Sequence, residues 1–316
     1  MLVTLAQRWL HALKIKSWPK LLAPMVLGQA LGVADASGVT FGRVALAAGV
    51  GLAFTLLDAI LIVLLNDWGD QEVDAIKRRR FPDAGSPKTI PDGILPADHV
   101  LLGGLVAAAA LLVLGFRGGE AMGRPLLGAV ATLAAGMFVV YTFPPASLNY
   151  RGGGELVEAV GVGLVLPQAN AYLQSGQLAS PRMLALGPAL VFLAASSAIA
   201  SGLSDEESDR EGGKRTFATW LGNPTSRRLL ETCVGIGFTM LALSPALPGG
   251  PGVWVVLPPL AVLAWHARRL PGLGEAARTN RFAEQAVYKD VLHRGLWGAQ
   301  VALAVTLLVA KVVGSR

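Results

Sequence analysis

Nine long apolar runs constrain the fold of this 316-residue chain more than any other feature. A helix that crosses the hydrocarbon core of a bilayer needs about 17 to 25 mostly apolar residues. The runs are apolar on all sides, which favours helices over the alternating strands of a membrane barrel. We therefore predict an all-α, polytopic membrane protein with nine transmembrane helices in a single domain, residues 1–316. The runs cover approximately 18–34, 43–65, 100–116, 125–143, 156–173, 183–203, 229–248, 252–267 and 295–313.

The eighth run is the least regular, because Pro258 and Pro259 lie inside it and a broken or re-entrant helix is an alternative there. The composition agrees with a membrane protein: 53% of the residues are hydrophobic and only 15% are charged. Soluble domains average about 25% charged residues, so two ordinary soluble domains are excluded. The single cysteine, Cys233, excludes an internal disulfide framework.

Residues 1–17 mix apolar residues with Arg8, Lys14 and Lys16 and lack the layout of a cleaved signal peptide. An interfacial amphipathic helix is expected there. Basic loops stay cytoplasmic, so the distribution of Lys and Arg indicates the orientation. We expect a multi-pass protein of the cell membrane, with the N-terminus and the acidic loops cytoplasmic and the C-terminus on the opposite side. All 27 basic residues then lie on the cytoplasmic side except Arg43, Arg117, Arg124, Arg182, Lys311 and Arg316.

The net charge of +6 follows from this topology and does not indicate a nucleic-acid partner.

Nine of the 21 acidic residues fall in two short stretches, residues 66–74 and 205–211, which follow the second and the sixth apolar run. The two stretches indicate related half-sites, at 66–97 and 204–228. In a helix, residues three and four apart are neighbours. One face therefore holds Asn66, Asp67, Asp70 and Asp74, and another holds Asp205 and Asp209.

Two carboxylates about 5 Å apart repel each other by roughly 3 kcal/mol at an effective dielectric near 20. A pocket that holds five carboxylates therefore requires cations to balance their charge. Oxygen ligands without His or Cys select Mg²⁺ over zinc. The four histidines are scattered without metal-ligand spacing. The alternative is that the acidic residues are solvated loop charges. The predicted metal ligands are Asp67, Asp70, Asp74, Asp205 and Asp209.

Basic residues follow both acidic stretches: Lys77, Arg78, Arg79, Arg80 and Lys88 after the first, and Lys214 and Arg215 after the second. Of the first group, Arg78 and Lys88 are predicted to bind substrate. Carboxylates that bind Mg²⁺ beside cations that bind phosphate oxygens make a diphosphate site. At the mouth of an apolar helix bundle, such a site fits an amphiphile with a phosphorylated head and a hydrocarbon tail. We therefore predict an enzyme that binds an isoprenyl diphosphate and ionises its allylic C–O bond, with metal ions stabilising the leaving group.

The two acidic stretches resemble those of the UbiA superfamily of intramembrane prenyltransferases. Asn66, Asp67, Asp70 and Asp74 fit its first aspartate-rich motif, N-D-x-x-D-x-x-x-D, and residues 205–209 fit its second, D-x-x-x-D. The resemblance covers nearly the whole chain. It implies a helix bundle around a central cavity that opens to the bilayer. It also implies two Mg²⁺ ions between the motifs and the diphosphate, and transfer of the prenyl chain to an acceptor.

Within the superfamily, residues 150–156 and 205–216 resemble the group that prenylates 1,4-dihydroxy-2-naphthoate in menaquinone synthesis. The resemblance implies 1,4-dihydroxy-2-naphthoate or a related quinone precursor as the aromatic acceptor. The sequence departs from the group at Asn149, in residues 88–93 and at 203–204. Because these departures border the site, 4-hydroxybenzoate, homogentisate or a specialised metabolite stays open as the acceptor.

The resemblance implies roles for further residues. Asn66 would hydrogen-bond the diphosphate or the acceptor, and Lys20 resembles a lysine of the group's N-terminal motif, a substrate-binding position. Tyr141 would stabilise the carbocation through its ring, or else is a tyrosine of the membrane interface. Arg151 would hold the diphosphate or an acceptor carboxylate, or else is a charge on the rim.

Asp58 lies inside the second apolar run, about 12 Å before Asn66 and on roughly the same face. An ionisable residue at such a position indicates function, and we expect it to face the cavity and to contact the acceptor or orient a neighbour. The alternative is a protonated carboxyl bonded to Ser or Thr of an adjacent helix. Glu158 and Glu231, nearer the ends of their runs, are expected to be structural.

Two other classes compete with an aromatic prenyltransferase. A UbiA-type terpene cyclase would use the same ionisation without an acceptor, and a transporter or structural membrane protein would only bind ions at the acidic stretches. Intact Asn66-Asp67 and Lys214-Arg215-Thr216 favour the transferase. Neither the prenyl chain length nor the oligomeric state can be read from the sequence.

Overall fold

The computed structural model describes residues 4–38, 40–83 and 87–314, and these residues form helices and loops without a strand. Residues 1–3 of the expected interfacial helix, 84–86 of the first half-site and Arg316 lie outside the described residues. Long helices occupy the predicted apolar runs, so the all-α fold is confirmed. They are α2 (Pro19–Asp35), α3 (Phe41–Gly69), α5 (Ala97–Val113), α7 (Leu127–Thr142), α9 (Gly154–Val160) with α10 (Leu166–Ser175), α11 (Pro181–Gly202), α14 (Asn223–Leu243), α15 (Val253–Ala267) and α17 (Phe282–Gly314).

Within the described ranges, six helices are long and apolar enough to cross a membrane. In these six, α5 is extended by α6 (Gly119–Ala121), and α9 and α10 form one span. The helices α2, α7 and α15 have 17, 16 and 15 residues. The predicted number of nine spans is therefore not confirmed. α15 is continuous through Pro258 and Pro259, without the break considered from the sequence.

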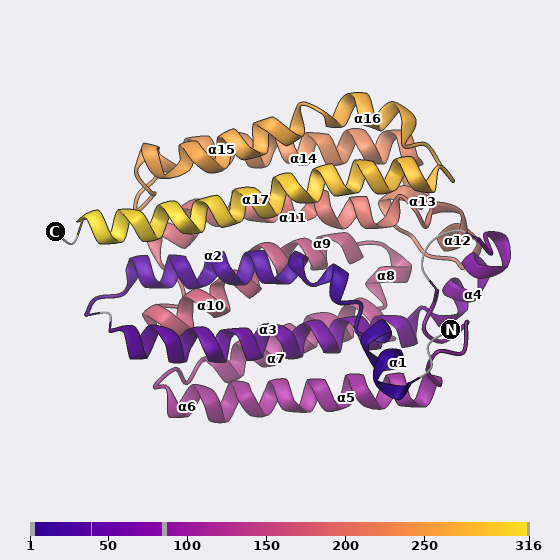
Figure 1. Cartoon of the computed structure of the whole chain (residues 1–316), viewed down its shortest axis with the longest axis horizontal. Helices are drawn as coiled ribbons and strands as arrows, with labels where there is room; N and C mark the ends of the chain where they lie inside the picture. The colour runs from indigo at the N-terminus through magenta and orange to yellow at the C-terminus, as the bar shows by residue number, and fades with distance from the viewer. Residues whose placement is uncertain (1–3, 39, 84–86, 315–316) are drawn as a thin grey trace.

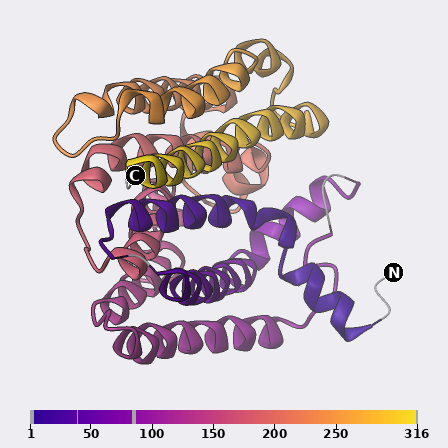
Figure 2. The same cartoon turned by 60° about the vertical axis from the view of Figure 1, so that its left-hand side comes forward.

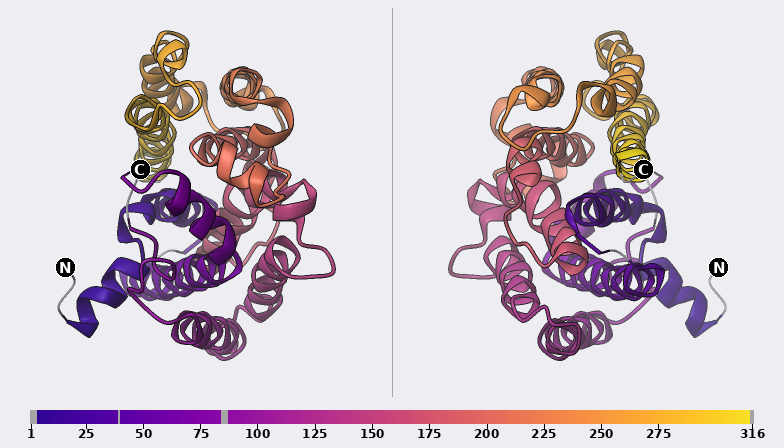
Figure 3. Two further views of the ribbon diagram at one scale, coloured as in Figure 1. Left: turned by 90° about the vertical axis from the view of Figure 1, so that its right-hand side faces the viewer. Right: turned by 90° about the vertical axis from the view of Figure 1, so that its left-hand side faces the viewer.

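The long helices lie side by side along the longest axis of the molecule (Figure 1). The helices of the first third of the chain form one side of the bundle and those of the last third form the other (Figures 2 and 3). Across the bundle, α2 packs against both α10 and α17, α3 packs against α5, and α11 packs against α14. The two halves of the chain therefore meet where α2 packs against α17.

Glycines set the close approach of α2 and α10. A Cβ at Gly28 would lie 2.8 Å from the Cβ of Asn170, and one at Gly32 would lie 2.7 Å from the Cβ of Gln174. Small residues allow such contact between helix backbones in a membrane. Polar side chains then bridge the pair: Gln29 Nε2 donates to Asn170 Oδ1 at 2.8 Å. This fixes the wall on which the central cavity is built.

An amphipathic helix does form at the N-terminus, as α1 (Leu5–Ala12). Thr4 and Gln7 make a reciprocal capping box at its start. Leu5 and Leu10 are exposed, whereas Ala12 is buried, which suits a helix at a membrane interface. A short turn, η1 (Ile15–Ser17), then leads into α2.

The remaining short helices connect the long ones: α4 (Gln71–Arg80), α8 (Leu148–Arg151), α12 (Glu206–Glu211), α13 (Phe217–Leu221) and α16 (Leu270–Ala276). α4 and α12 pack against each other, and they lie at the end of the bundle that also carries α1, away from the C-terminus (Figure 1). The two acidic stretches are thus brought to the same end of the molecule.

Candidate active site

The first acidic stretch lies where α3 passes into α4. Asp70 leaves the helical conformation (φ −96°, ψ 5°) and separates the two helices. The helical hydrogen bonds nevertheless continue through it, because Asp70 N donates to Asn66 O and Asp74 N donates to Asp70 O, both at 2.8 Å. In the second stretch, Asp209 N donates to Asp205 O at 2.7 Å. The predicted i, i+4 stacking is therefore kept in both stretches.

Both acidic stretches line one polar cavity of about 220 Å³. The structure thus brings together two half-sites that are far apart in the sequence. Of the residues proposed from the sequence, this cavity contains Asn66, Asp67, Asp70, Asp74, Lys88, Tyr141, Asp205, Asp209 and Lys214.

Four of the five aspartates form ion pairs with lysines. Lys88 Nζ lies 2.6 Å from Asp74 Oδ1, and Lys214 Nζ lies 2.7 Å from Asp70 Oδ2. The other two pairs are Lys14 with Asp67 and Lys77 with Asp205. The ammonium groups therefore supply the counter-charge that the gathered carboxylates require.

Lys14 and Lys77 were not among the predicted substrate-binding residues, although Lys77 belongs to the basic run that follows the first acidic stretch. Lys77 follows Asp74 by three positions and so shares its helix face, a spacing that would have identified it. Lys14 reaches the site from the N-terminal segment, where its backbone is left-handed (φ 47°). No local signal in the sequence marks that turn.

Asp209 is the exception among the five carboxylates. It is only 5% exposed, and within the described chain no lysine forms an ion pair with it. Burial raises the pKa of Asp209 to about 7, against the lowering effect of Lys214. Burial would also raise the pKa of Asp205, but the charges of Lys77 and Lys88 lower it below its ordinary value. The two carboxylates of the second motif therefore differ in their affinity for a proton.

Neutral side chains hold Asp67 and Asp70 in position. Thr89 Oγ1 donates to Asp67 Oδ2 at 2.6 Å, and Asn66 Nδ2 donates to Asp70 Oδ2 at 3.0 Å. Asn149 Nδ2 donates to Asp70 Oδ1 at 3.4 Å. Thr89 and Asn149 lie in two of the segments where the sequence departs from the naphthoate group, and both contact the first motif directly.

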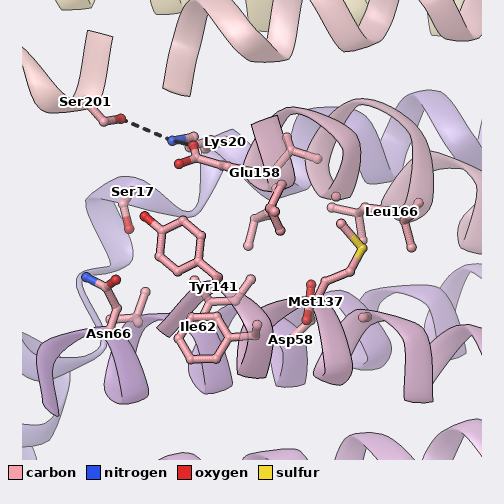
Figure 4. A pocket seen from close by; sticks show the side chains of 18 of the residues that line it. Ser17, Lys20, Asp58, Ile62, Asn66, Met137, Tyr141, Glu158, Leu166 and Ser201 are labelled. Atoms are coloured by element: carbon pink, nitrogen blue, oxygen red, sulfur yellow. Dashed lines mark hydrogen bonds and ion pairs between the residues drawn. The ribbon is translucent and has the colours of Figure 1, made fainter. Parts of the chain in front are cut away.

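An apolar cavity of about 330 Å³ continues from the polar one. Phe54, Ile62, Met137 and Phe138 contribute to its wall. The residues that line both cavities are Lys14, Asn66, Tyr141, Glu158 and Ser201. The Tyr141 ring projects into this space (Figure 4). A carboxylate-rich chamber that opens into an apolar one matches the shape of an amphiphile.

Lys20 lines the apolar cavity and forms an ion pair with Glu158, which lines both cavities. Its Nζ also donates to Ser201 Oγ at 3.2 Å (Figure 4). Glu158, expected to be structural, thus lines the site. Glu231 instead accepts a hydrogen bond from Tyr288 at 2.9 Å, away from either cavity.

Asp58 faces the apolar cavity, as expected, and is 7% exposed (Figure 4). The alternative, a hydrogen bond to Ser or Thr of an adjacent helix, is not found, because no described residue bonds to the Asp58 carboxyl. The Asp58 carboxyl thus lies among the largely apolar walls of the cavity that continues from the acidic one.

Three predicted substrate-binding residues lie outside both cavities: Arg78, Arg151 and Arg215. Arg78 is engaged by Asp92 at 2.8 Å. Arg151 and Arg215 are exposed. Arg215 N donates to Tyr150 O at 3.2 Å, and this backbone contact joins the two segments while their arginine side chains stay in solvent. Their predicted contact with substrate is not supported by this arrangement.

The donor set fits a hard divalent cation, because the chamber offers carboxylate and amide oxygens without His or Cys. In the described part of the chain, no three potential ligands already surround one point. The lysines hold four carboxylates instead. A divalent cation would therefore take over the counter-charge that the ammonium groups provide.

The chain belongs to the UbiA prenyltransferase family, which matches residues 21–288. It is a prenyltransferase and a multi-pass membrane protein. It is 29% identical over 244 residues to the 1,4-dihydroxy-2-naphthoate octaprenyltransferase of Escherichia coli (strain K12). The aligned region covers 74% of this chain and 75% of that protein.

Solved structures share the fold. A UbiA homologue from Archaeoglobus fulgidus bound to GPP and Mg²⁺ is 18% identical, with a TM-score of 0.68 over 93% of this chain and 99% of the other. The same homologue bound to DMAPP and Mg²⁺ gives 17% identity and a TM-score of 0.66 over the same shares. A structure of digeranylgeranylglyceryl phosphate synthase gives 13% identity and a TM-score of 0.57, over 94% and 99%.

Proposed function

We propose that the chain catalyses Mg²⁺-dependent transfer of the isoprenyl group of a polyprenyl diphosphate to an aromatic acceptor, 1,4-dihydroxy-2-naphthoate or a related quinone precursor. The observation that carries this proposal is the carboxylate-lined chamber that continues into an apolar cavity. The relative of Escherichia coli, named as a naphthoate octaprenyltransferase, supports the acceptor class. The homologue structures with GPP and DMAPP support the donor class.

In the proposed reaction, the C1–O bond of the allylic diphosphate breaks and the diphosphate leaves with the electron pair. A ring carbon of the acceptor supplies a pair of π electrons for the new C–C bond with C1. The same carbon then releases a proton, or carbon dioxide where it carries the carboxylate, and the electron pair that this frees restores aromaticity. We propose that the Tyr141 ring, which lines both cavities, stabilises positive charge at C1.

The proposed ligands of two Mg²⁺ ions are Asp67, Asp70, Asp74, Asp205 and Asp209. Bound Mg²⁺ would neutralise the charge that develops on the departing diphosphate. Before substrate binds, Lys14, Lys77, Lys88 and Lys214 hold four of these carboxylates. We propose that the ammonium groups exchange partners on binding, from carboxylate to phosphate oxygen, while the metal ions take over the carboxylates.

The acceptor is proposed to bind at the junction of the cavities. Asn66 and Tyr141 line both chambers, and Lys20 offers an ammonium group for an acceptor carboxylate in exchange for Glu158. Asp58 lies about 12 Å along α3 from Asn66, within reach of the inner part of a bound substrate. This arrangement gives the aromatic ring a polar edge while the prenyl tail fills the apolar cavity.

We further propose that the protein lies in the cell membrane with this end of the bundle cytoplasmic. The site and α1 are at one end, and the C-terminus is at the other (Figure 1). The predominance of Lys and Arg on the loops of the site end supports this orientation.

The test is a mass-spectrometric screen of the purified protein with prenyl diphosphates of several lengths, each crossed with dihydroxynaphthoate, hydroxybenzoate and homogentisate. The expected result is a prenylated naphthoate that requires Mg²⁺. A terpene formed from the donor alone would show a cyclase instead. Product only with another acceptor would retain the mechanism and overturn the naphthoate assignment.

A further inference from the structure

A separate cavity of about 400 Å³ lies at the end of the bundle opposite the acidic chamber. It is bounded by the last turns of α2 and α17 and the first turns of α11 and α15, which lie near the C-terminus in Figure 1. Most of its wall is apolar or glycine, and its two charged residues are Arg182 and Lys311. The proposed reaction makes no use of this far-end cavity.

Among the described residues, the charged groups of the far-end cavity leave one positive charge without a carboxylate partner. Arg182 forms an ion pair with Asp35, so these two charges cancel. Lys311 Nζ donates to the backbone oxygen of Ala36 at 2.6 Å and of Ala34 at 3.3 Å. Over the described ranges, no carboxylate pairs with Lys311. Backbone carbonyls orient the ammonium group without neutralising it, so the charge of Lys311 stays available to an anion at the membrane surface.

Arg182 is the second cationic donor group that lines the far-end cavity. Its side chain is 26% exposed and pairs with Asp35 through one terminal nitrogen, whereas its Nε is enclosed by protein and lacks a hydrogen-bond partner among the residues that the structure covers. A guanidinium has five N–H donors, so the pair with Asp35 leaves further donors on Arg182. Together with Lys311, it presents N–H groups to a ligand that bears one negative charge and several acceptor oxygens.

The surroundings indicate a membrane lipid. Val253 is 63% exposed, and Val309 and Val313 are 48% and 62% exposed, on the helices that border the cavity. Such exposed valines suit contact with acyl chains, and an apolar wall is of little use to a free inorganic anion. We propose that the far-end cavity binds the phosphodiester headgroup of an anionic phospholipid, with Lys311 and Arg182 contacting its phosphate and the acyl chains running along α17.

The charge count explains why the lipid should be anionic overall. The group formed by Arg182, Asp35 and Lys311 has a net charge of +1, which one phosphodiester balances. A zwitterionic lipid brings its own cation and would leave the positive charge of Lys311 unbalanced. The inference is independent of the acceptor and of the prenyl reaction.

The test uses the full chain, delipidated in detergent and then titrated with phosphatidylglycerol, phosphatidylcholine or inorganic phosphate. Bound lipid is counted by native mass spectrometry, and stabilisation is followed by thermal unfolding. Phosphatidylglycerol is expected to remain bound and to raise the unfolding temperature, whereas the other two ligands are expected to do neither. Equal retention of both lipids, or the same stabilisation by inorganic phosphate, would overturn the proposal.

Variants locate the site. Lys311→Gln is expected to weaken phosphatidylglycerol binding at least about tenfold, and Lys311→Arg, which keeps the charge, is expected to retain it. The matched control is Arg117→Gln, an arginine of the same end that is 83% exposed and lies outside the far-end cavity. Prenyl transfer in detergent, unchanged in all three variants, shows that they fold. Equal lipid affinity in Lys311→Gln and Arg117→Gln would refute the assignment.

Discussion

Replacing Lys214 with methionine tests whether ammonium groups hold the metal-binding carboxylates of the metal-free protein. Lys214 Nζ lies 2.7 Å from Asp70 Oδ2, and the two side chains are 7% and 13% exposed. At that separation, an effective dielectric near 20 gives an attraction of about 6 kcal/mol, a ceiling before desolvation is subtracted. Because removing one partner of a buried pair costs about 3–5 kcal/mol, we expect the free energy of unfolding of metal-free Lys214→Met to fall by that amount.

The same substitution is expected to shift the affinities of two ligands in opposite directions. Without the ammonium group, Asp70 has no competing cation, so Mg²⁺ should bind more tightly. Inorganic diphosphate loses a cationic contact and should bind more weakly. Each shift is expected to be at least about tenfold, which corresponds to about 1.4 kcal/mol.

Isothermal titration calorimetry in detergent measures both affinities, and denaturant titration measures the stability. Arg117→Met, which removes an exposed cation at the far end, is the control and should change neither affinity. Unchanged or weaker binding of Mg²⁺ by Lys214→Met would refute the proposed exchange of ammonium for metal.

Further predictions concern the carboxylates. Asp70→Ala and Asp209→Ala should each lower turnover at least about a hundredfold, since each removes charge stabilisation of the leaving group; Mg²⁺-dependent product formation at the normal rate in both would make the mechanism untenable. Because burial raises the pKa of Asp209 to about 7, its ionised form destabilises the metal-free fold increasingly from about pH 4 to pH 7. Asp209→Asn should therefore stabilise that fold more at about pH 8 than at about pH 4, and equal thermal shifts at both would contradict this. Asp58→Asn should raise the KM for the acceptor, and normal turnover with normal acceptor affinity would remove Asp58 from the site. Chelation by EDTA should stop turnover, with recovery in Mg²⁺ but not in Zn²⁺; recovery in Zn²⁺ would contradict the ligand assignment.

Spacing within one helix located much of the candidate site. Asp70 and Asp74 share a face because a helix repeats every 3.6 residues, and the hydrogen bonds through Asp70 keep this pattern across the junction of α3 and α4. The same rule applied to Lys77 would have found it. Arg151 and Arg215 show the limit of a motif, because the motif places a residue near the site in sequence without fixing the direction of its side chain.

The all-helical membrane fold and the two acidic half-sites were determined by the sequence alone, since hydropathy and helical periodicity are properties of neighbouring residues. Only the tertiary structure decided which charges meet. Lys14 is 53 residues from Asp67, and Lys77 is 128 residues from Asp205. Such pairs depend on how α1, α4 and α12 pack at one end of the bundle. Arg182 and Lys311 likewise line one cavity at the other end only because the ends of α11 and α17 lie close together there.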